Sequence, residues 1–482
     1  MNIRNLYRVL LSALAATASV GLGLTTTLAP LQAQETNPAP PSGKFIVHEW
    51  GTFTTFSGSN GVHLDFRPLK DQELPGFVFD RANQSGYLWF GKGRLKTRVR
   101  METPVTYFYT DVERRIHVDV EFPRGLLTEF YPPVRSQYPP FDDKTATSED
   151  GEPIGNGKLH WGEITLIPTA QLRPPVSDIL TSQILGDHLA TTIFPEAHGN
   201  HYDAARHTDS AIVHMRLESE ATKTPTGQGP TGDFFEKFLF YRGVGKFEIP
   251  VSVTSEVPGV LNVTNHGREV LRRAIVYQLN GETITYEIVP NVAPGKSVTV
   301  RQSNRPVEMN TVAEILRQEL VAAGLYEKEA TAMINTWTSS WFMEQGTRLF
   351  YMVPQETTDR ELPLHISPQP DEQLRVMVGR VEIMSASEEQ RLIGIVKQAA
   401  EQRLTNLNQQ LAQGVEHPVA PIIVPEEFRQ LGRLAEPALH RLRDVSLDAN
   451  VRNEAEAILA QLAVDRALEE VQSRDAGQVP NN

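Results

Sequence analysis

The chain has 482 residues, of which 40% are hydrophobic and 22% charged, and its formal net charge is -13. It contains no cysteine, which excludes disulfides, thiol nucleophiles, iron–sulfur clusters and a lipid-modified N-terminal cysteine. The acidic balance argues against nucleic acid or an anionic membrane surface as the main partner. The length predicts two or three domains with ordinary hydrophobic cores.

Residues 1–33 have the layout of a secretory signal peptide: two arginines, an apolar run that ends at Leu24, and small residues up to Ala33. The run is short for a membrane span, so we expect cleavage and no stable transmembrane span afterwards; an uncleaved anchor is the alternative. Residues 34–43 are Pro-rich and are expected to form a flexible tether. Together they predict an exported protein, periplasmic or extracellular.

Residues 44–384 carry mostly strand signals. Ile116, Val118, Val120 and Phe122 alternate with polar residues, which predicts a strand with one buried face, and the aromatic run before it predicts a hairpin. Short β-branched strands recur between about 247 and 301 and resemble part of an immunoglobulin-like sandwich. The expected fold is therefore mainly β, with a sandwich-like body.

A helical pair interrupts this body. The hydrophobic period changes near residue 310, where Thr311 and Glu314 form a capping-box pattern, and helices are expected over about 310–340. Strand patterns return from Arg348 to Val353 and from Leu374 to Ile383. We expect these strands to complete the body.

Residues 385–475 predict a small all-α domain. A capping box at Ser387 and Gln390 opens a long helix, and the segment after the following linker resembles a single HEAT-type helical repeat. One repeat cannot bury its own apolar face, so it is expected to pack on the preceding helix or on a protein partner. Residues 476–482 are expected to be disordered.

One histidine-rich stretch is a candidate metal site. Glu196 to Asp209 reads EAHGNHYDAARHTD, and its His198, His201, Asp203 and His207 offer imidazole and carboxylate ligands for a divalent metal such as zinc. The spacing lacks the fixed helical context of HExxH. A solvated loop without an ion therefore stays as the alternative.

The same stretch also predicts a ligand site without a metal. Arg206 and Asp209, with His201 beside them, would suit an anionic or polyol ligand, because a guanidinium fork binds paired oxygens. The alternative is a structural ion pair that anchors a loop.

A second group of candidates comes from carboxylates near aromatic residues. His48 and Glu49 lie on the expected first strand, and Glu102 follows in RMETPV. Paired carboxylates with aromatic surfaces are what glycoside cleavage requires. The alternative is that they pack at strand ends. The candidate catalytic residues are therefore His48, Glu49, Glu102, Arg206 and Asp209. No P-loop, GxGxxG, GxSxG or EF-hand motif occurs.

Several segments together resemble an uncharacterised family of exported bacterial proteins. They are HEWGTFT (His48 to Thr54), RMETPV (Arg100 to Val105), NHYDAARHTD (Asn200 to Asp209), EKFLFYRG (Glu236 to Gly243), the block from Ser340 to Pro354, and VMVGRVE (Val376 to Glu382). The resemblance implies that residues 44–384 are one evolutionary unit, and it implies no activity. A carboxylate often stands in that family where this chain has His207.

Two functional hypotheses follow. The first is an exported ligand- or partner-binding scaffold, whose helical tail binds a protein. The second is a secreted hydrolase, metal-assisted or carboxylate-based. The position of the His48–Glu49 strand relative to Asn200–Asp209 separates them, since an enzyme would need both around one pocket.

Overall fold

The computed structural model describes residues 43–66, 74–80, 97–140, 155–169, 193–197, 199–218, 230–272 and 274–477. The predicted signal peptide and nearly all of the predicted tether lie outside these residues, as do His198 and the last five residues. The fold is mainly β, with a helical C-terminal part, which confirms the predicted fold class. None of the described helices combines the length and apolarity that crossing a membrane requires.

A ten-stranded mixed sheet forms the centre of the body. Its order is β15-β14-β17-β19-β1-β4-β11-β6-β3, with β2 paired to β1. The strands are β1 (Ile46–Ser57), β2 (His63–Leu64), β3 (Phe79–Asp80), β4 (Val99–Tyr109), β6 (Gly125–Tyr131), β11 (Leu239–Gly245), β14 (Ala274–Asn280), β15 (Thr283–Val289), β17 (Gly346–Val353) and β19 (Glu372–Ile383).

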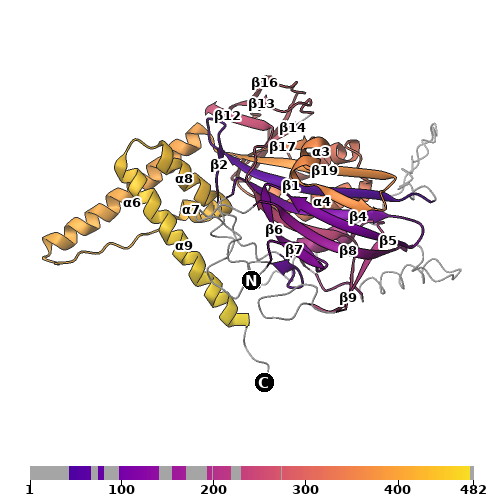
Figure 1. Cartoon of the computed structure of the whole chain (residues 1–482). Coiled ribbons are helices and arrows are strands. Elements are labelled where there is room, and N and C mark those ends of the chain that lie inside the picture. The colour runs from indigo at the N-terminus through magenta and orange to yellow at the C-terminus, as the bar shows by residue number, and fades with distance from the viewer. Residues whose placement is uncertain are drawn as a thin grey trace, which may run out of the picture. The chain divides into compact units, whose positions relative to one another are not determined.

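Strand β1 is the middle of this sheet and is buried along its whole length. It pairs in parallel with β19, so the beginning and the end of the body lie side by side, indigo beside orange in Figure 1. On its other side it pairs antiparallel with β4. Because both faces of the strand are covered, each of its polar side chains needs a hydrogen-bond or ion-pair partner from the protein itself.

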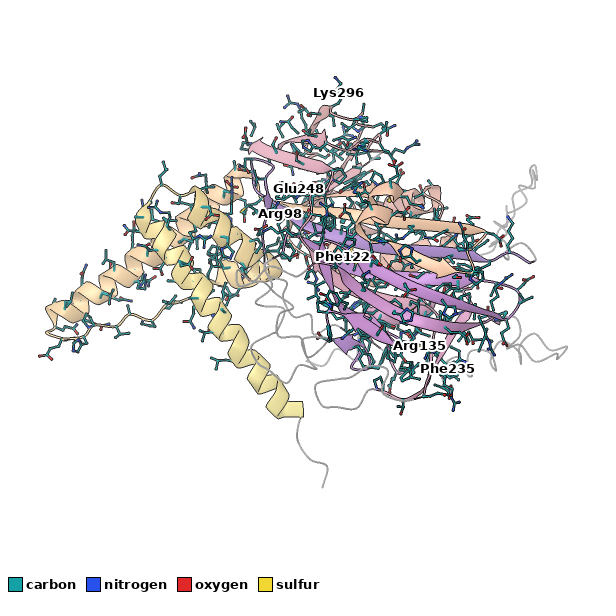
Figure 2. All side chains as sticks on the ribbon, in the orientation of Figure 1. Arg98, Phe122, Arg135, Phe235, Glu248 and Lys296 are labelled. Carbon is teal, nitrogen blue, oxygen red and sulfur yellow. The ribbon has the colours of Figure 1, made fainter. Side chains whose placement is uncertain are left out.

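A second sheet covers one face of the first. Its strands are β5 (Arg114–Phe122), β7 (Ser136–Tyr138), β8 (Gly157–Ile167), β9 (Ile212–Leu217), β10 (Gly232–Glu236) and β18 (Leu364–Ser367). The apolar side chains of both sheets form one core, in which Phe122 is fully buried (Figure 2). The body is thus a sandwich, as predicted.

The predicted hairpin of β4 and β5 is wrong. Both segments are strands, but β4 pairs with β1 and β11, whereas β5 pairs with β8 and β18 in the other sheet. The burial patterns give the reason. All of β4 is buried, as a central strand requires, whereas β5 buries alternate residues and fits a sheet with one solvated face.

The immunoglobulin-like segment does not form a sandwich of its own. Strands β12 (Val251–Val257), β13 (Val260–Asn265) and β16 (Ser297–Arg301) form a third, small sheet, while β14 and β15 extend the central sheet. The ion pair between Arg98 and Glu248 lies near the start of this segment (Figure 2). The spacing of turns predicted strands here, but not which sheet each would join.

Helices cover the other face of the central sheet. Helix α3 (Met309–Ala322), helix α4 (Glu327–Phe342) and the 3-10 helix η4 (His201–Arg206) share a second apolar core with it, and α5 (Gln355–Glu361) is a short helix before β18. The helical pair confirms the prediction over about 310–340. However, α3 begins two residues before the predicted cap at Thr311, with Glu308 at its N-cap.

The helical tail has its own core. It comprises α6 (Ala386–Ala412), α7 (Glu426–Gln430), η5 (Gly432–Leu434), α8 (Ala435–Val445) and α9 (Ala449–Gly477). Leu392 and Val396 of α6 pack with Leu439 and Ile458, so the repeat-like pair covers its apolar face with the preceding helix, as expected. The N-cap of α6 is Ser385 rather than Ser387.

Candidate functional site

The predicted candidates His48 and Glu49 lie on opposite faces of β1, and each has structural partners. His48 Nδ1 is 2.9 Å from Glu329 in the first turn of α4, and Tyr109 donates to the same carboxylate at 2.7 Å. Glu49 faces the second sheet and accepts from Thr106 at 3.0 Å and from Arg375 Nε at 2.7 Å. His48 therefore fixes α4 on the sheet, and Glu49 holds neighbouring strands together.

Arg206 has a structural partner as well. Its Nε and Nη2 donate to Glu236 at 3.0 and 2.8 Å, and the Glu236 carboxylate is fully buried. Asp203 lies 3.5 Å from the same guanidinium. The bidentate pair fastens η4 to β10, which is the alternative that the sequence left open.

The remaining residues of the histidine-rich stretch point in different directions. Asp209 accepts from exposed Lys328 at 2.7 Å, and His207 is exposed. No group of three or more metal-ligand residues comes together within the described ranges. Because His198 lies outside them, the four-residue metal site stays a prediction.

His201 differs, because it faces the central sheet. Its Nε2 lies 3.5 Å from Arg242 Nη2, and its ring centroid lies 6.3 Å from that of Trp337 on α4. Burial and the nearby Arg242 lower the pKa of His201 to about 4, and Glu102 opposes this shift. The imidazole is therefore neutral at pH 7.

His201 stands at the edge of a row of buried charged and hydroxyl side chains, which we call the polar band. The band crosses six adjacent strands, because these residues fall at neighbouring register positions: Arg348 on β17, Arg380 and Glu382 on β19, Thr52 and Thr54 on β1, Arg100 and Glu102 on β4, Arg242 on β11, and Glu129 on β6. Each is at most 3% exposed.

The band holds together by ion pairs and hydrogen bonds. Thr54 donates to Glu102 at 2.6 Å, and Arg100 Nε lies 3.2 Å from the same carboxylate. Arg380 and Arg348 both contact Glu382. Glu102 is thus the predicted catalytic residue that belongs to the band, and it lies on the face of the sheet opposite to Glu49.

Not every donor beside the band is satisfied. Several buried groups among the described residues have no hydrogen-bond partner, and four of them lie beside the band: the Thr52 hydroxyl, Arg380 Nη1, and the indole N–H groups of Trp337 and Trp341. The two tryptophans are four residues apart on α4 and stack on each other, and Trp341 contacts Phe350, which is opposite Arg380 in the sheet. All four groups therefore belong to the layer between α4 and the central sheet.

Sequence reasoning missed Arg242, Arg380 and Trp337. The sequence did contain a signal for Arg380, because this arginine lies within the largely apolar strand segment VMVGRVE, and it is buried there. Such a charge must be paired or must serve a ligand. Residues of the band come from five of the six sequence segments singled out above, and the sixth, NHYDAARHTD, reaches its edge through His201.

The two predicted halves of an enzyme site lie near each other, but their polar side chains do not come together. The His48–Glu49 strand and the Asn200–Asp209 segment both pack near α4, since His48 contacts Glu329 and the His201 ring lies beside Trp337. Their polar side chains nevertheless have separate partners, and the pockets of about 610 and 240 Å³ in the described part of the chain are lined by neither segment's His48, Glu49 or His201.

No protein-family model matches the sequence, and a search of curated proteins finds no match. Among solved structures, the Fcho1 mu-homology domain from Danio rerio, with a bound Eps15 peptide, matches at 7% identity and TM-score 0.26, over 72% of this chain and 99% of that chain. The yeast delta-COP-I mu-homology domain, complexed with a Dsl1 WxWxV peptide, matches at 7% identity and TM-score 0.23, over 71% and 97%. Likeness this low supports no conclusion about function.

Proposed function

We propose that the protein is an exported binding protein that holds a small anionic ligand against the polar band. The observation that carries this proposal is the set of four partnerless donor groups, Thr52, Arg380, Trp337 and Trp341, in one buried layer. Buried donors nearly always have a partner, and each one left without costs about 1–3 kcal/mol. A ligand with several acceptor oxygens would remove that cost.

The hydrogen-bonding properties of these donor groups indicate which kind of ligand would fit. An indole N–H and a guanidinium can only donate, so they favour carboxylate or phosphate oxygens over groups that donate themselves. His201 is only partly buried and stands beside Arg242 at the edge of the band. A bound anion would also offset the positive potential that Arg242 imposes on His201.

Hydrolysis is less well supported than binding. The carboxylates Glu49 and Glu102 lie on opposite faces of the sheet and cannot flank one bond. With a pKa of about 4, His201 is a weak base at neutral pH, far from the value that general base catalysis favours. Export stays part of the proposal and rests on the N-terminal sequence pattern.

The helical tail stays a proposed surface for a protein partner. Although its own core is filled, Leu404 and Leu411 on α6 and Ile423 in the following segment are exposed. Exposed apolar side chains that gather on one element are typical of interaction surfaces.

The ligand proposal is tested with inorganic phosphate, sulfate, citrate and succinate, by calorimetry and thermal shift on the protein without its first 33 residues. We expect at least one anion to bind and to raise the melting temperature. Arg380→Gln should abolish binding, and Trp337→Phe, which removes one N–H, should weaken it about tenfold. Trp161→Phe is the matched control, because that indole already donates to Pro132 at 2.9 Å.

The result is clear in either direction. Binding that survives in Trp161→Phe but falls in both band variants supports the site. If no anion binds, or if all variants bind equally, the band is a structural network whose donors are met by water, and the proposed function is wrong.

A further inference from the structure

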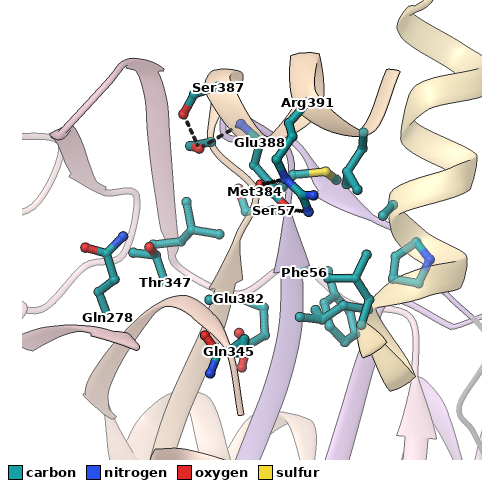
Figure 3. A pocket seen from close by; sticks show the side chains of 18 of the residues that line it. Phe56, Ser57, Gln278, Gln345, Thr347, Glu382, Met384, Ser387, Glu388 and Arg391 are labelled. Atoms are coloured by element: carbon teal, nitrogen blue, oxygen red, sulfur yellow. Dashed lines mark hydrogen bonds and ion pairs between the residues drawn. The ribbon is translucent and has the colours of Figure 1, made fainter. Parts of the chain in front are cut away.

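A second site lies where the body meets the helical tail. A pocket of about 610 Å³ is bordered by the ends of β1, β14, β17 and β19 on one side and by α6, α7 and α8 on the other (Figure 3). Ligand sites commonly measure roughly 300–1,000 Å³ and often lie between two packed units. The pocket is distinct from the proposed anion site, although Glu382 of the polar band lies at its base.

Three of the four charged residues that line this pocket are already compensated, and the fourth, Glu427 on α7, adds a negative charge near Arg391. Arg391 donates through Nε and Nη2 to the two carboxylate oxygens of Glu388 at 2.9 and 2.8 Å. The Glu382 carboxylate forms ion pairs with Arg348 and Arg380. An anion entering the pocket would meet Glu427 and a cation would meet Arg391, so the lining favours a neutral ligand.

The remaining lining offers many neutral hydrogen-bonding groups beside apolar ones. Figure 3 shows Gln278 and Thr347 on one wall, Ser57 and Arg391 near the top, and Phe56 opposite. No described residue forms a hydrogen bond with the Gln278 amide side chain, which can therefore both donate and accept. The half-buried Leu64 and Met384 add apolar surface between these polar groups.

A peptide would have to bind there without joining a sheet. Strand β1 is paired with β19 and, at its end, with β2; β19 is paired with β17 and β1; and β14 is paired with β15 and β17. Apart from the two-residue strand β2, whose Leu64 lines the pocket, no described strand at the pocket has an unpaired edge, so recognition by strand addition is disfavoured. A ligand must instead be recognised by side chains.

We propose that this pocket binds a neutral polyhydroxylated ligand, of the size of one or two sugar rings. Sugar hydroxyls donate and accept, which suits the planar Gln278 amide and the Arg391–Glu388 pair. The C–H faces of a ring can pack on the half-buried side chains of Leu64 and Met384, which also line the pocket. This inference does not depend on the anion site, since it uses other residues and the opposite ligand charge.

The chain offers a matched control for testing it. Arg317 on α3 forms the same type of pair as Arg391, three residues from its carboxylate partner Glu314, with distances of 2.8 and 2.7 Å. Arg317 does not line the pocket. Comparing Arg391→Gln with Arg317→Gln therefore separates the pocket from the general effect of losing a surface ion pair.

The experiment uses calorimetry and ligand-detected NMR on the protein without its first 33 residues. The probes are glucose, galactose, N-acetylglucosamine, maltose and cellobiose, up to about 10 mM, where a ligand of millimolar affinity registers. We expect at least one to bind, with affinity reduced about tenfold or more by Arg391→Gln and unchanged by Arg317→Gln. Gln278→Leu, on the facing wall, should reduce it too, which guards against misfolding of one variant.

Three results would overturn the proposal. They are no binding by any sugar of the panel, equal binding by Arg391→Gln and Arg317→Gln, and binding of an unstructured peptide library that Arg391→Gln abolishes while sugars stay inert. The last would assign the pocket to a protein partner. Phosphate and sulfate binding are measured in a separate experiment. A failure of sugar binding therefore does not contradict the proposed anion site.

Discussion

The contact between body and tail depends on one buried carboxylate. Glu389 on α6 accepts from the backbone N–H and the hydroxyl of Ser59, both at 2.9 Å, and from Arg441 Nε on α8 at 2.8 Å. Glu389 is 6% exposed and Ser59 is 7% exposed. We call this contact the Glu389 junction; it joins the turn after β1 to two helices of the tail.

Replacing Glu389 by Leu removes all three hydrogen bonds and leaves Arg441 without its partner in a nearly buried position. Hydrogen bonds to a charged group contribute about 1.5–3 kcal/mol each, and breaking a buried ion pair costs about 3–5 kcal/mol. The terms overlap, so we expect a loss of about 4 kcal/mol in the free energy that docks the tail.

Hydrogen exchange followed by mass spectrometry separates docking from global stability. In Glu389→Leu, amides of α6 and α8 should exchange faster, while those of β1 and β19 keep their protection, because the central sheet has its own core. Glu314→Leu on α3 is the control, since its exposed pair with Arg317 should contribute at most about 0.5 kcal/mol. Tail exchange no faster than in Glu314→Leu would refute this role of the junction.

Two further predictions concern single buried groups. The folded-state pKa of His201, about 4, lies below its ordinary 6.5, so the folded protein binds fewer protons between these values and stability should fall as the pH drops through that window, by about 3 kcal/mol in total. Denaturant unfolding between pH 7 and pH 4 should show a shallower fall in His201→Gln, and equal slopes would contradict the assignment. Buried Asn265 donates to the carbonyls of Glu269 and Val292 at 2.7 and 2.8 Å, so Asn265→Ala should lose about 2–3 kcal/mol in the same assay. The exposed Asn262→Ala should lose under about 0.5 kcal/mol, and similar losses in both would show that burial of Asn265 is not the cause.

The sequence allowed much of the fold to be predicted, because burial leaves a periodic pattern. The alternation from Ile116 to Phe122, the helical pair near residue 310 and the change to helix after residue 385 all correspond to observed elements. Strand pairing was harder. The hairpin prediction for β4 and β5 failed because adjacency in sequence carries no information on which of two stacked sheets a strand enters.

The candidate site was predicted only in part. His201 was predicted as a metal ligand or as part of an anion or polyol site with Arg206, and Glu102 as a catalytic residue; the structure brings both to the polar band. Arg206 and Glu49 were candidates of the same standing in the sequence, and in the structure each binds a buried partner, Glu236 and Arg375 respectively. Whether such a residue is free for a ligand depends on partners that are far away in the sequence, and a local sequence pattern does not reveal these partners.

A crystal structure of the protein soaked with the tightest-binding anion of the panel tests the central claim most directly. We predict that carboxylate or phosphate oxygens of that anion lie within about 3.2 Å of Arg380 Nη1 and of the Trp337 indole nitrogen. If these nitrogens bond only to ordered water or to protein groups, and the anion lies elsewhere, the polar band is not a ligand site.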